Sequence, residues 1–99
     1  MTNDTQVVQI VISKLKAGAS RERFIELTKQ MKEWFLTQEG FISYEVYEND
    51  RHWADKIVWR NSESAKRINK AFLESDIFKE MGTLVEPDYR GFFGSRVEI

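Results

Sequence analysis

Apolar residues recur with two different periods along the chain, and the order of these periods predicts the fold. Residues 7–15 are rich in valine and isoleucine, which alternate between the two faces of a strand. Residues 21–38 instead carry apolar side chains three or four positions apart, as on one face of a helix. The members of this stripe are Phe24, Leu27, Met31, Trp34 and Phe35. We therefore predict a strand followed by an amphipathic helix of about five turns.

The second half of the chain repeats this order with a hairpin in between. Residues 41–49 and 53–60 alternate as strands do, and the polar stretch 49–52 is expected to join them as a hairpin loop. Helical spacing returns after the second of these strands. The only proline places a loop at residues 86–88, and residues 89–98 are predicted to form the last strand.

Capping signals mark the ends of the helices. Ser20 stands where an N-cap belongs, and Gly40 is well placed to end the first helix in a left-handed conformation. Ser62 is expected to cap the next helix and Ser75 a further one, so the second helical region should break near Glu74.

The resulting order, strand–helix–strand–strand–helix–strand, predicts an α+β fold. It is the ferredoxin-like βαββαβ pattern, in which both helical regions cover one face of a four-stranded antiparallel sheet. Neighbouring strand residues point to opposite faces, so the helices cannot cover all the large apolar residues of the strands. These are Val7, Val8, Val11, Val46, Val58, Trp59, Phe92 and Phe93. Each one left in water costs roughly 1.5–3 kcal/mol, which favours a symmetric homodimer over a monomer with scattered surface apolar groups.

Length and composition exclude several classes of protein. The 99 residues fit a single domain, residues 1–99, and the net charge of -1 offers no concentrated basic face to nucleic acid or an acidic membrane. The absence of cysteine excludes disulfides, thiolate metal sites and a cysteine nucleophile. No apolar run approaches the ~20 residues of a membrane span, and residues 1–5 are too polar for a signal peptide. A cytoplasmic location is expected.

The sequence offers few groups for metal or nucleotide chemistry. One histidine and dispersed carboxylates do not provide a ligand set for zinc or iron. No glycine-rich nucleotide loop is present, and no Ser-His-acid arrangement can be assigned. We therefore expect no metal and no cofactor.

Several residues are candidates for a site that binds an aromatic compound. Trp59 has two interpretations: it fills the core between sheet and second helix, or it forms a pocket wall against which an aromatic ligand lies. Tyr44 and Tyr47 point to opposite faces of their strand, so at most one of them lines a given pocket. Asn69 is predicted on the second helix near Ile68 and Phe72, where it is a candidate polar group between the helix and the sheet. His52, expected in the hairpin loop, has a pKa suited to proton transfer, although a lone loop histidine is more often solvated.

Three stretches of the chain share a pattern with a known family. In residues 57–65 an apolar strand, a tryptophan, a short polar stretch and an alanine-containing helix follow one another. Residues 75–79 read as a second helical turn, and residues 39–44 enter the second strand through Gly-Phe. In their order and spacing these stretches resemble the antibiotic biosynthesis monooxygenase family of the dimeric α+β barrel superfamily, and the resemblance extends over residues 7–97.

This resemblance implies a dimeric α+β barrel and a cofactor-independent monooxygenase. The substrate would be a small aromatic or quinone-like compound in a cleft between sheet and helices, and oxygen would react with the deprotonated substrate itself. The predicted substrate-binding residues are Trp59, Phe72 and Trp34. Candidate catalytic or orienting residues remain Tyr44, Tyr47, Asn69 and His52. The alternative is a non-catalytic dimer of the same fold that binds a small ligand or another protein.

The haem-degrading members of the family provide a contrast. In them an asparagine on the first strand and a histidine on the helix after the tryptophan complete the site. Here only the tryptophan, Trp59, has a counterpart, because the first strand offers Val11 flanked by Gln9 and Ser13. The sole histidine, His52, precedes the tryptophan instead of following it. Haem breakdown is therefore not expected.

Overall fold

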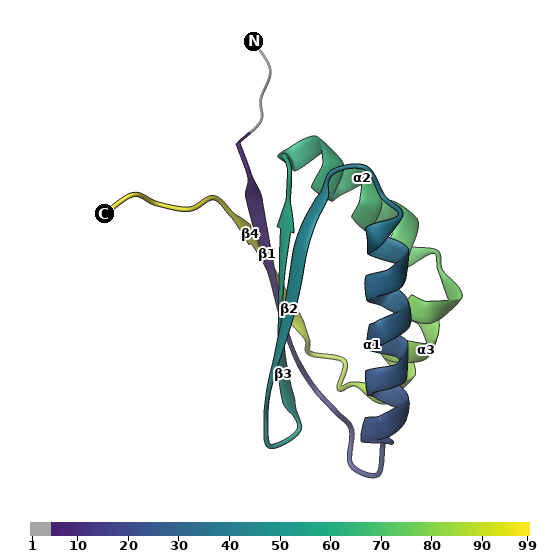
Figure 1. The fold of residues 1–99 in the computed structure, drawn as a ribbon. Coiled ribbons are helices and arrows are strands. Elements are labelled where there is room, and N and C mark those ends of the chain that lie inside the picture. Colours follow the sequence, from purple (N-terminus) through teal and green to yellow (C-terminus); the bar gives the residue numbers. More distant parts are fainter. Residues whose placement is uncertain (1–4) are drawn as a thin grey trace.

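The computed structural model describes residues 5–99 and places the elements in the predicted order (Figure 1). They are β1 (Val7–Lys14), α1 (Arg21–Leu36), β2 (Phe41–Asn49), β3 (His52–Trp59), α2 (Ser62–Leu73), α3 (Asp76–Leu84) and β4 (Arg90–Gly94). The second helical region is divided between α2 and α3 at Glu74, which confirms the predicted break. Residues 1–4 lie outside the described residues. They belong to the N-terminal segment that is predicted above to be too polar for a signal peptide.

The four strands form one antiparallel sheet in the order β2-β3-β1-β4. The three helices of residues 5–99 lie on one side of this sheet, and no helix of this described part of the chain lies on the other side (Figure 1). The predicted α+β, ferredoxin-like architecture is thus confirmed. On the helix-covered face, β1 residues Gln9, Val11 and Ser13 lie opposite β3 residues Ile57, Asp55 and Trp53.

The helix caps agree with the sequence at two of three positions. Ser20 and Ser75 each accept a hydrogen bond, at 3.1 Å, from the backbone N–H three residues further on. The expected cap at Ser62 is wrong by one residue. The cap is Asn61, whose extended backbone lets its side-chain oxygen accept from the N–H of Ser64 at 2.8 Å. Asparagine caps a helix as well as serine does, so Ser62 becomes the first helical residue.

Gly40 serves the turn into β2 and not the end of α1. The helix ends at Leu36, two residues earlier than predicted, and Thr37 provides its C-cap. Gly40 has the expected positive φ, 102°, and a Cβ at this position would lie 2.3 Å from Oγ of Ser64. Glycine is therefore required here both for its backbone conformation and for the close approach of α2.

Pairing between β2 and β3 extends closer to the hairpin tip than predicted. Asp50 and Arg51 both adopt positive φ, 48° and 69°, which allows a two-residue turn. His52 is consequently the first residue of β3 and pairs with Asn49, so its placement in the loop is corrected. The last strand is shorter than predicted, because only Arg90–Gly94 finds pairing partners on β1.

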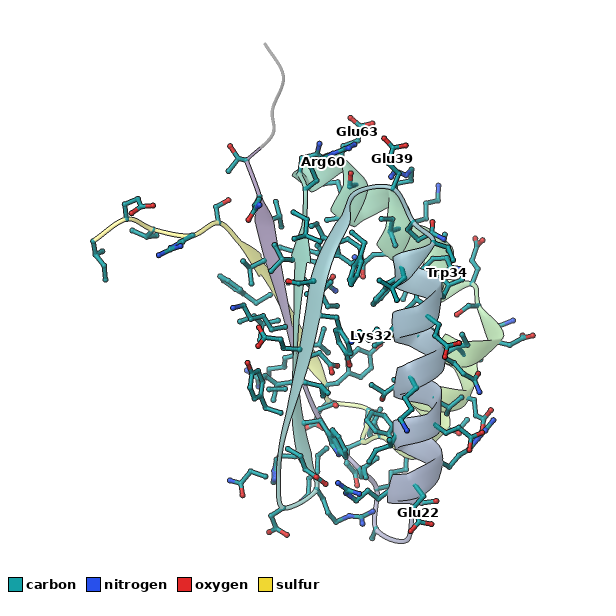
Figure 2. The ribbon with its side chains drawn as sticks, in the orientation of Figure 1. Glu22, Lys32, Trp34, Glu39, Arg60 and Glu63 are labelled. Atoms are coloured by element: carbon teal, nitrogen blue, oxygen red, sulfur yellow. The ribbon has the colours of Figure 1, made fainter. Side chains whose placement is uncertain are left out.

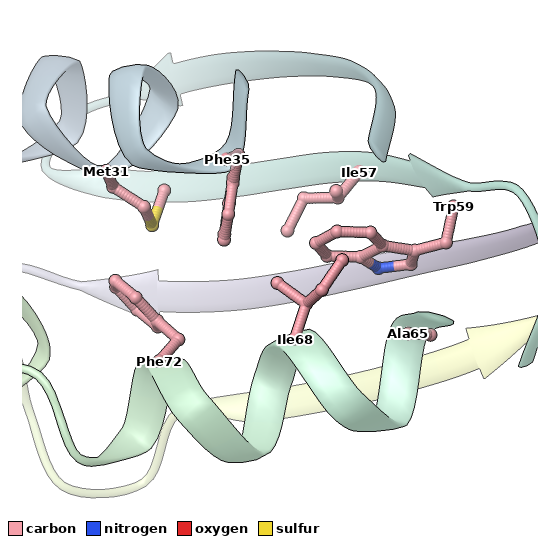
Figure 3. Packing of buried hydrophobic residues seen from close by; sticks show 7 residues of the cluster. All are labelled: Met31, Phe35, Ile57, Trp59, Ala65, Ile68 and Phe72. Carbon is pink, nitrogen blue, oxygen red and sulfur yellow. The ribbon is translucent and has the colours of Figure 1, made fainter. Parts of the chain in front are cut away.

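Two apolar clusters fill the space between sheet and helices. The larger one surrounds the fully buried Trp59, which meets Phe35 edge to face with ring centroids 5.2 Å apart (Figure 3). The smaller one contains Leu15, Phe24, Trp53 and Val85. Figure 2 shows charged side chains, including Glu39 and Arg60, at one end of the molecule.

The helix-free face of the sheet carries large exposed apolar side chains. Ile12, Tyr47 and Phe92 are 46%, 55% and 63% exposed. Their positions follow from the register, since Ile12 pairs with Arg90, and Tyr47 pairs with Ala54. No helix within residues 5–99 is long and apolar enough to cross a membrane.

Candidate functional site

A cavity of about 190 Å³ lies between the helix-covered face of the sheet and the helices. Its walls are mainly aromatic and aliphatic side chains, among them Phe24, Met31, Phe35, Phe72, Phe78 and Met81. Four polar side chains interrupt this surface: Gln9, Ser13, Asp55 and Asn69. An apolar cavity with a few polar groups is the usual form of a small-molecule site.

Asp55 is the carboxyl group among the residues that line this cavity. It is only 9% exposed, and it accepts a hydrogen bond of 2.7 Å from the hydroxyl of Tyr44 on β2. Burial raises the pKa of Asp55 from 3.8 to about 6, and the hydrogen bond from Tyr44 opposes part of this rise. Burial and the neighbouring carboxylate also raise the pKa of Tyr44, so its hydroxyl remains a donor. Asp55 is therefore a proton acceptor whose pKa is close to neutrality.

Gln9 and Asn69 form a pair of amides in the wall of the same cavity. The amide nitrogen of each donates to the amide oxygen of the other, and both hydrogen bonds are 2.9 Å long. The two residues come from β1 and α2, so the pair links the sheet to the helix layer.

The orientation of both amides is determined by their other partners. The indole N–H of Trp59 can only donate, and it contacts the Gln9 oxygen at 2.8 Å. The Ala65 carbonyl can only accept, and it takes a 2.8 Å hydrogen bond from the Asn69 nitrogen. One N–H of Gln9 and one lone pair of the Asn69 oxygen are left over for a molecule in the cavity.

The predicted substrate-binding residues have different positions. Phe72 lines the cavity. Trp59 is fully buried beside it in the core, and its N–H is engaged by Gln9, which agrees with the core interpretation (Figure 3). Trp34 lies on α1 outside the cavity lining, half-buried, with its ring centroid 5.8 Å from that of Phe72 (Figure 2).

The candidate catalytic residues are likewise divided. Asn69 lines the cavity, and Tyr44 stands behind Asp55 as its hydrogen-bond donor. Tyr47 lies on the opposite face of the sheet, where its hydroxyl donates to Glu45 at 2.9 Å. His52 is exposed at the hairpin, with Nδ1 3.2 Å from the carbonyl oxygen of Asp50. Neither Tyr47 nor His52 belongs to the cavity lining.

Sequence reasoning missed Asp55 and gave Gln9 no role. The signal that could have identified Asp55 is the alternation of core-facing and outward-facing residues along β3. Asp55 alternates in step with Trp53, Ile57 and Trp59, so a charged residue occupies a position that strand periodicity assigns to the core. A carboxyl group at such a position must be protonated, paired or functional.

Within residues 5–99 no group of three or more histidine or acidic side chains is arranged to hold a metal ion. The polar groups of the cavity, one carboxyl and two amides beside a serine, offer proton transfer and hydrogen bonding to a ligand.

The fold is that of a set of solved structures that includes cofactor-independent oxygenases. A variant of SnoaB from Streptomyces nogalater, a cofactor-independent oxygenase, superposes with a TM-score of 0.83 at 13% identity, over 96% of both chains. ActVA-Orf6, a monooxygenase from Streptomyces coelicolor bound to Nanaomycin D, gives 0.77 at 14% identity, covering 97% of this chain and 91% of its own. A conserved protein from Methanosarcina mazei gives 0.76 at 20% identity, over 95% of both chains.

These similarities confirm, at the level of the fold, the resemblance to antibiotic biosynthesis monooxygenases that the sequence indicated. No protein-family model matches the sequence, and no curated protein matches it either.

Proposed function

We propose that this chain is a cofactor-independent monooxygenase that oxidises a hydroquinone-like aromatic compound in the cavity. The observation that carries this proposal is Asp55, a buried carboxyl with a pKa of about 6 in the wall of an otherwise apolar cavity. A base with this pKa deprotonates a phenol efficiently near neutral pH. The descriptions of SnoaB and ActVA-Orf6 as oxygenases of the same fold add support.

The proposed reaction needs no external reductant, because the substrate supplies all the electrons. A hydroquinone and O₂ give a hydroxyquinone and water. The phenolate passes one electron to O₂, and the resulting pair combines to form a C–O bond at the adjacent ring carbon. Loss of the proton on that carbon breaks the O–O bond, leaving one oxygen atom in the product. The other oxygen atom leaves as water, with protons from the carboxyl and the substrate.

Each polar residue of the cavity has a role in this scheme. Asp55 accepts the phenolic proton and later returns it to the departing oxygen. The spare N–H of Gln9 stabilises the negative charge that develops on the phenolate oxygen, since a fixed donor in an apolar site is more effective than one in water. The spare lone pair of Asn69 accepts a hydrogen bond from the second hydroxyl. The aromatic walls hold the ring and exclude water.

Oxygen consumption tests the proposal. Purified protein in metal-free buffer is mixed with a panel of hydroquinones, and labelled ¹⁸O₂ traces the oxygen atoms. We expect one O₂ consumed per substrate, with one labelled atom in the quinone and one in water. If no member of a broad panel consumes oxygen while phenols still bind saturably, the non-catalytic binding protein becomes the better account.

Substitution of Tyr44 by phenylalanine should change the pH dependence. The Tyr44 hydroxyl donates to Asp55 and lowers the pKa of that carboxyl, so its loss should raise the pKa further. The acidic limb of the kcat/KM profile, which falls as Asp55 becomes protonated, should then move to higher pH. The exposed Tyr47→Phe variant is the matched control and should leave the limb unchanged. An unshifted limb in Tyr44→Phe would exclude Asp55 as the titrating base.

We further propose that two copies pair through the helix-free faces of their sheets. Ile12, Tyr47 and Phe92 are the exposed apolar groups that such pairing covers. Analytical ultracentrifugation at micromolar concentration should find a dimer for the wild type and a folded monomer for Ile12→Glu. Leu36→Glu changes an exposed leucine at the end of α1, on the helix side, and should remain dimeric. A well-folded single subunit in the wild type would contradict the proposal.

A further inference from the structure

We infer that the substrate of this site has one aromatic ring carrying an apolar tail, and that the tail leaves the cavity across Leu73 and Tyr89 beside Gly91. These three residues are called the rim below. The inference rests on the proposed function, because it specifies what the same cavity accepts.

The size of the cavity favours a single ring. A dry engineered cavity of about 150 Å³ lined by Leu, Ile and Phe binds benzene, whereas pockets for larger ligands span roughly 300–1,000 Å³. The cavity of about 190 Å³ lies close to the lower of these sizes. One ring with its hydroxyls therefore matches the volume of this cavity better than a fused system of several rings.

The rim is apolar and open to solvent. Leu73 and Tyr89 both line the cavity although they are 54% and 47% exposed. The next large residue on the same face of β4, Phe93, is 51% exposed. Leu73 and Tyr89 thus present exposed apolar surface at the edge of an apolar cavity. A purely polar substituent would gain nothing from this surface, and an alkyl chain gains by covering it.

Gly91 keeps the opening free. It lies on β4 opposite Val11, on the face of the sheet turned to the helices, and it lines the cavity. A Cβ built on Gly91 meets no atom within 4 Å, and its backbone does not require positive φ. Packing and backbone conformation would thus tolerate a side chain at this position, and its absence leaves a passage beside Leu73 and Tyr89. The proposed dimer contact lies on the other face of the sheet and does not cover this passage.

The experiment measures binding without turnover, using the series 4-methylphenol, 4-propylphenol and 4-hexylphenol. These phenols lack the second hydroxyl that the proposed reaction requires. Isothermal titration calorimetry compares the wild type with Leu73→Ser, with Gly91→Leu and with Leu36→Ser. The last of these alters an exposed leucine on α1 outside the cavity lining. Circular dichroism verifies that each variant is folded.

In the wild type and in Leu36→Ser, the affinity should rise about two- to fourfold for each added methylene, the upper value being that of a fully buried group. In Leu73→Ser the increase of affinity with chain length should be smaller. Gly91→Leu should weaken the binding of 4-hexylphenol about tenfold and change the binding of 4-methylphenol little. Equal affinities across the series, or the same rise in all four proteins, would overturn the inference. Oxygen uptake without dependence on chain length would remove only this inference, whereas graded binding without uptake on any hydroquinone would remove only the proposed function.

Discussion

Replacement of Asp55 by asparagine is expected to lower kcat/KM about 100- to 10,000-fold, the usual contribution of a general base. Asparagine keeps the shape of the side chain and still accepts the hydrogen bond from Tyr44, but it cannot take a proton from the substrate. The measurement is initial-rate oxygen uptake at pH 7–8 with the best hydroquinone of the panel. Retention of more than a tenth of the wild-type value would exclude Asp55 as the base.

The same substitution should stabilise the fold at neutral pH. Asp55 has a folded-state pKa of about 6 against an ordinary value of 3.8, so the folded protein prefers the protonated form. The protonated Asp55 side chain therefore contributes fully to the free energy of unfolding below about pH 4. This contribution is lost as the pH rises through 6. Asparagine remains neutral throughout, so at pH 8 the free energy of unfolding should increase by up to about 3 kcal/mol.

Urea unfolding at pH 4 and pH 8, at one protein concentration, measures this difference. The gain in Asp55→Asn should be present at pH 8 and nearly absent at pH 4. Glu33→Gln is the matched control, because Glu33 is an exposed carboxylate on α1, outside the cavity lining and away from the sheet face proposed to pair. This control should leave kcat/KM unchanged and the free energy of unfolding within about 0.5 kcal/mol of wild type. A less stable Asp55→Asn at pH 8 would contradict the desolvated carboxylate described here.

Trp59→Ala should have the largest effect on stability, a loss of about 3–5 kcal/mol in the free energy of unfolding. The side chain is fully buried among Phe35, Phe41 and Ile68, and its N–H satisfies Gln9. Since domains are stable by only about 5–15 kcal/mol, the variant should unfold at a much lower urea concentration.

Trp34→Ala is the comparison for this prediction, because Trp34 is only half-buried at the edge of the same cluster. Its loss of stability should be clearly smaller, and equal unfolding midpoints for the two variants would contradict the core role of Trp59. The role of the indole N–H is tested separately with Trp59→Phe, which keeps an aromatic ring in the core. It should reduce kcat more than it raises KM, because Gln9 loses the donor that fixes its orientation.

The sequence was sufficient to predict the elements whose signals are local. Alternation and helical spacing predicted strands and helices, and the serines at positions 20 and 75 correctly marked two helix starts. The opposite orientations of Tyr44 and Tyr47 also followed from alternation alone. The cap at Asn61 was missed because asparagine and serine are equally good caps at adjacent positions.

The site itself could be predicted only in part, because its contacts depend on register. Gln9 and Asn69 are 60 residues apart in the chain, and only the pairing of β1 with β3 brings Gln9 beside Trp59. Whether Trp59 forms a cavity wall or the core behind it depends on the same contact. The alternation of residues along β3 was enough to identify Asp55 as core-facing. How deeply it is buried depends on the helices that cover this face of the sheet.

The central claim is that Asp55 is a proton acceptor in the wall of the cavity. A ¹³C NMR titration of the carboxyl groups tests it most directly, with Asp55→Asn used to assign the signal. The expected pKa of Asp55 is about 6, because burial disfavours the charged carboxylate. A pKa near 4 would contradict the claim.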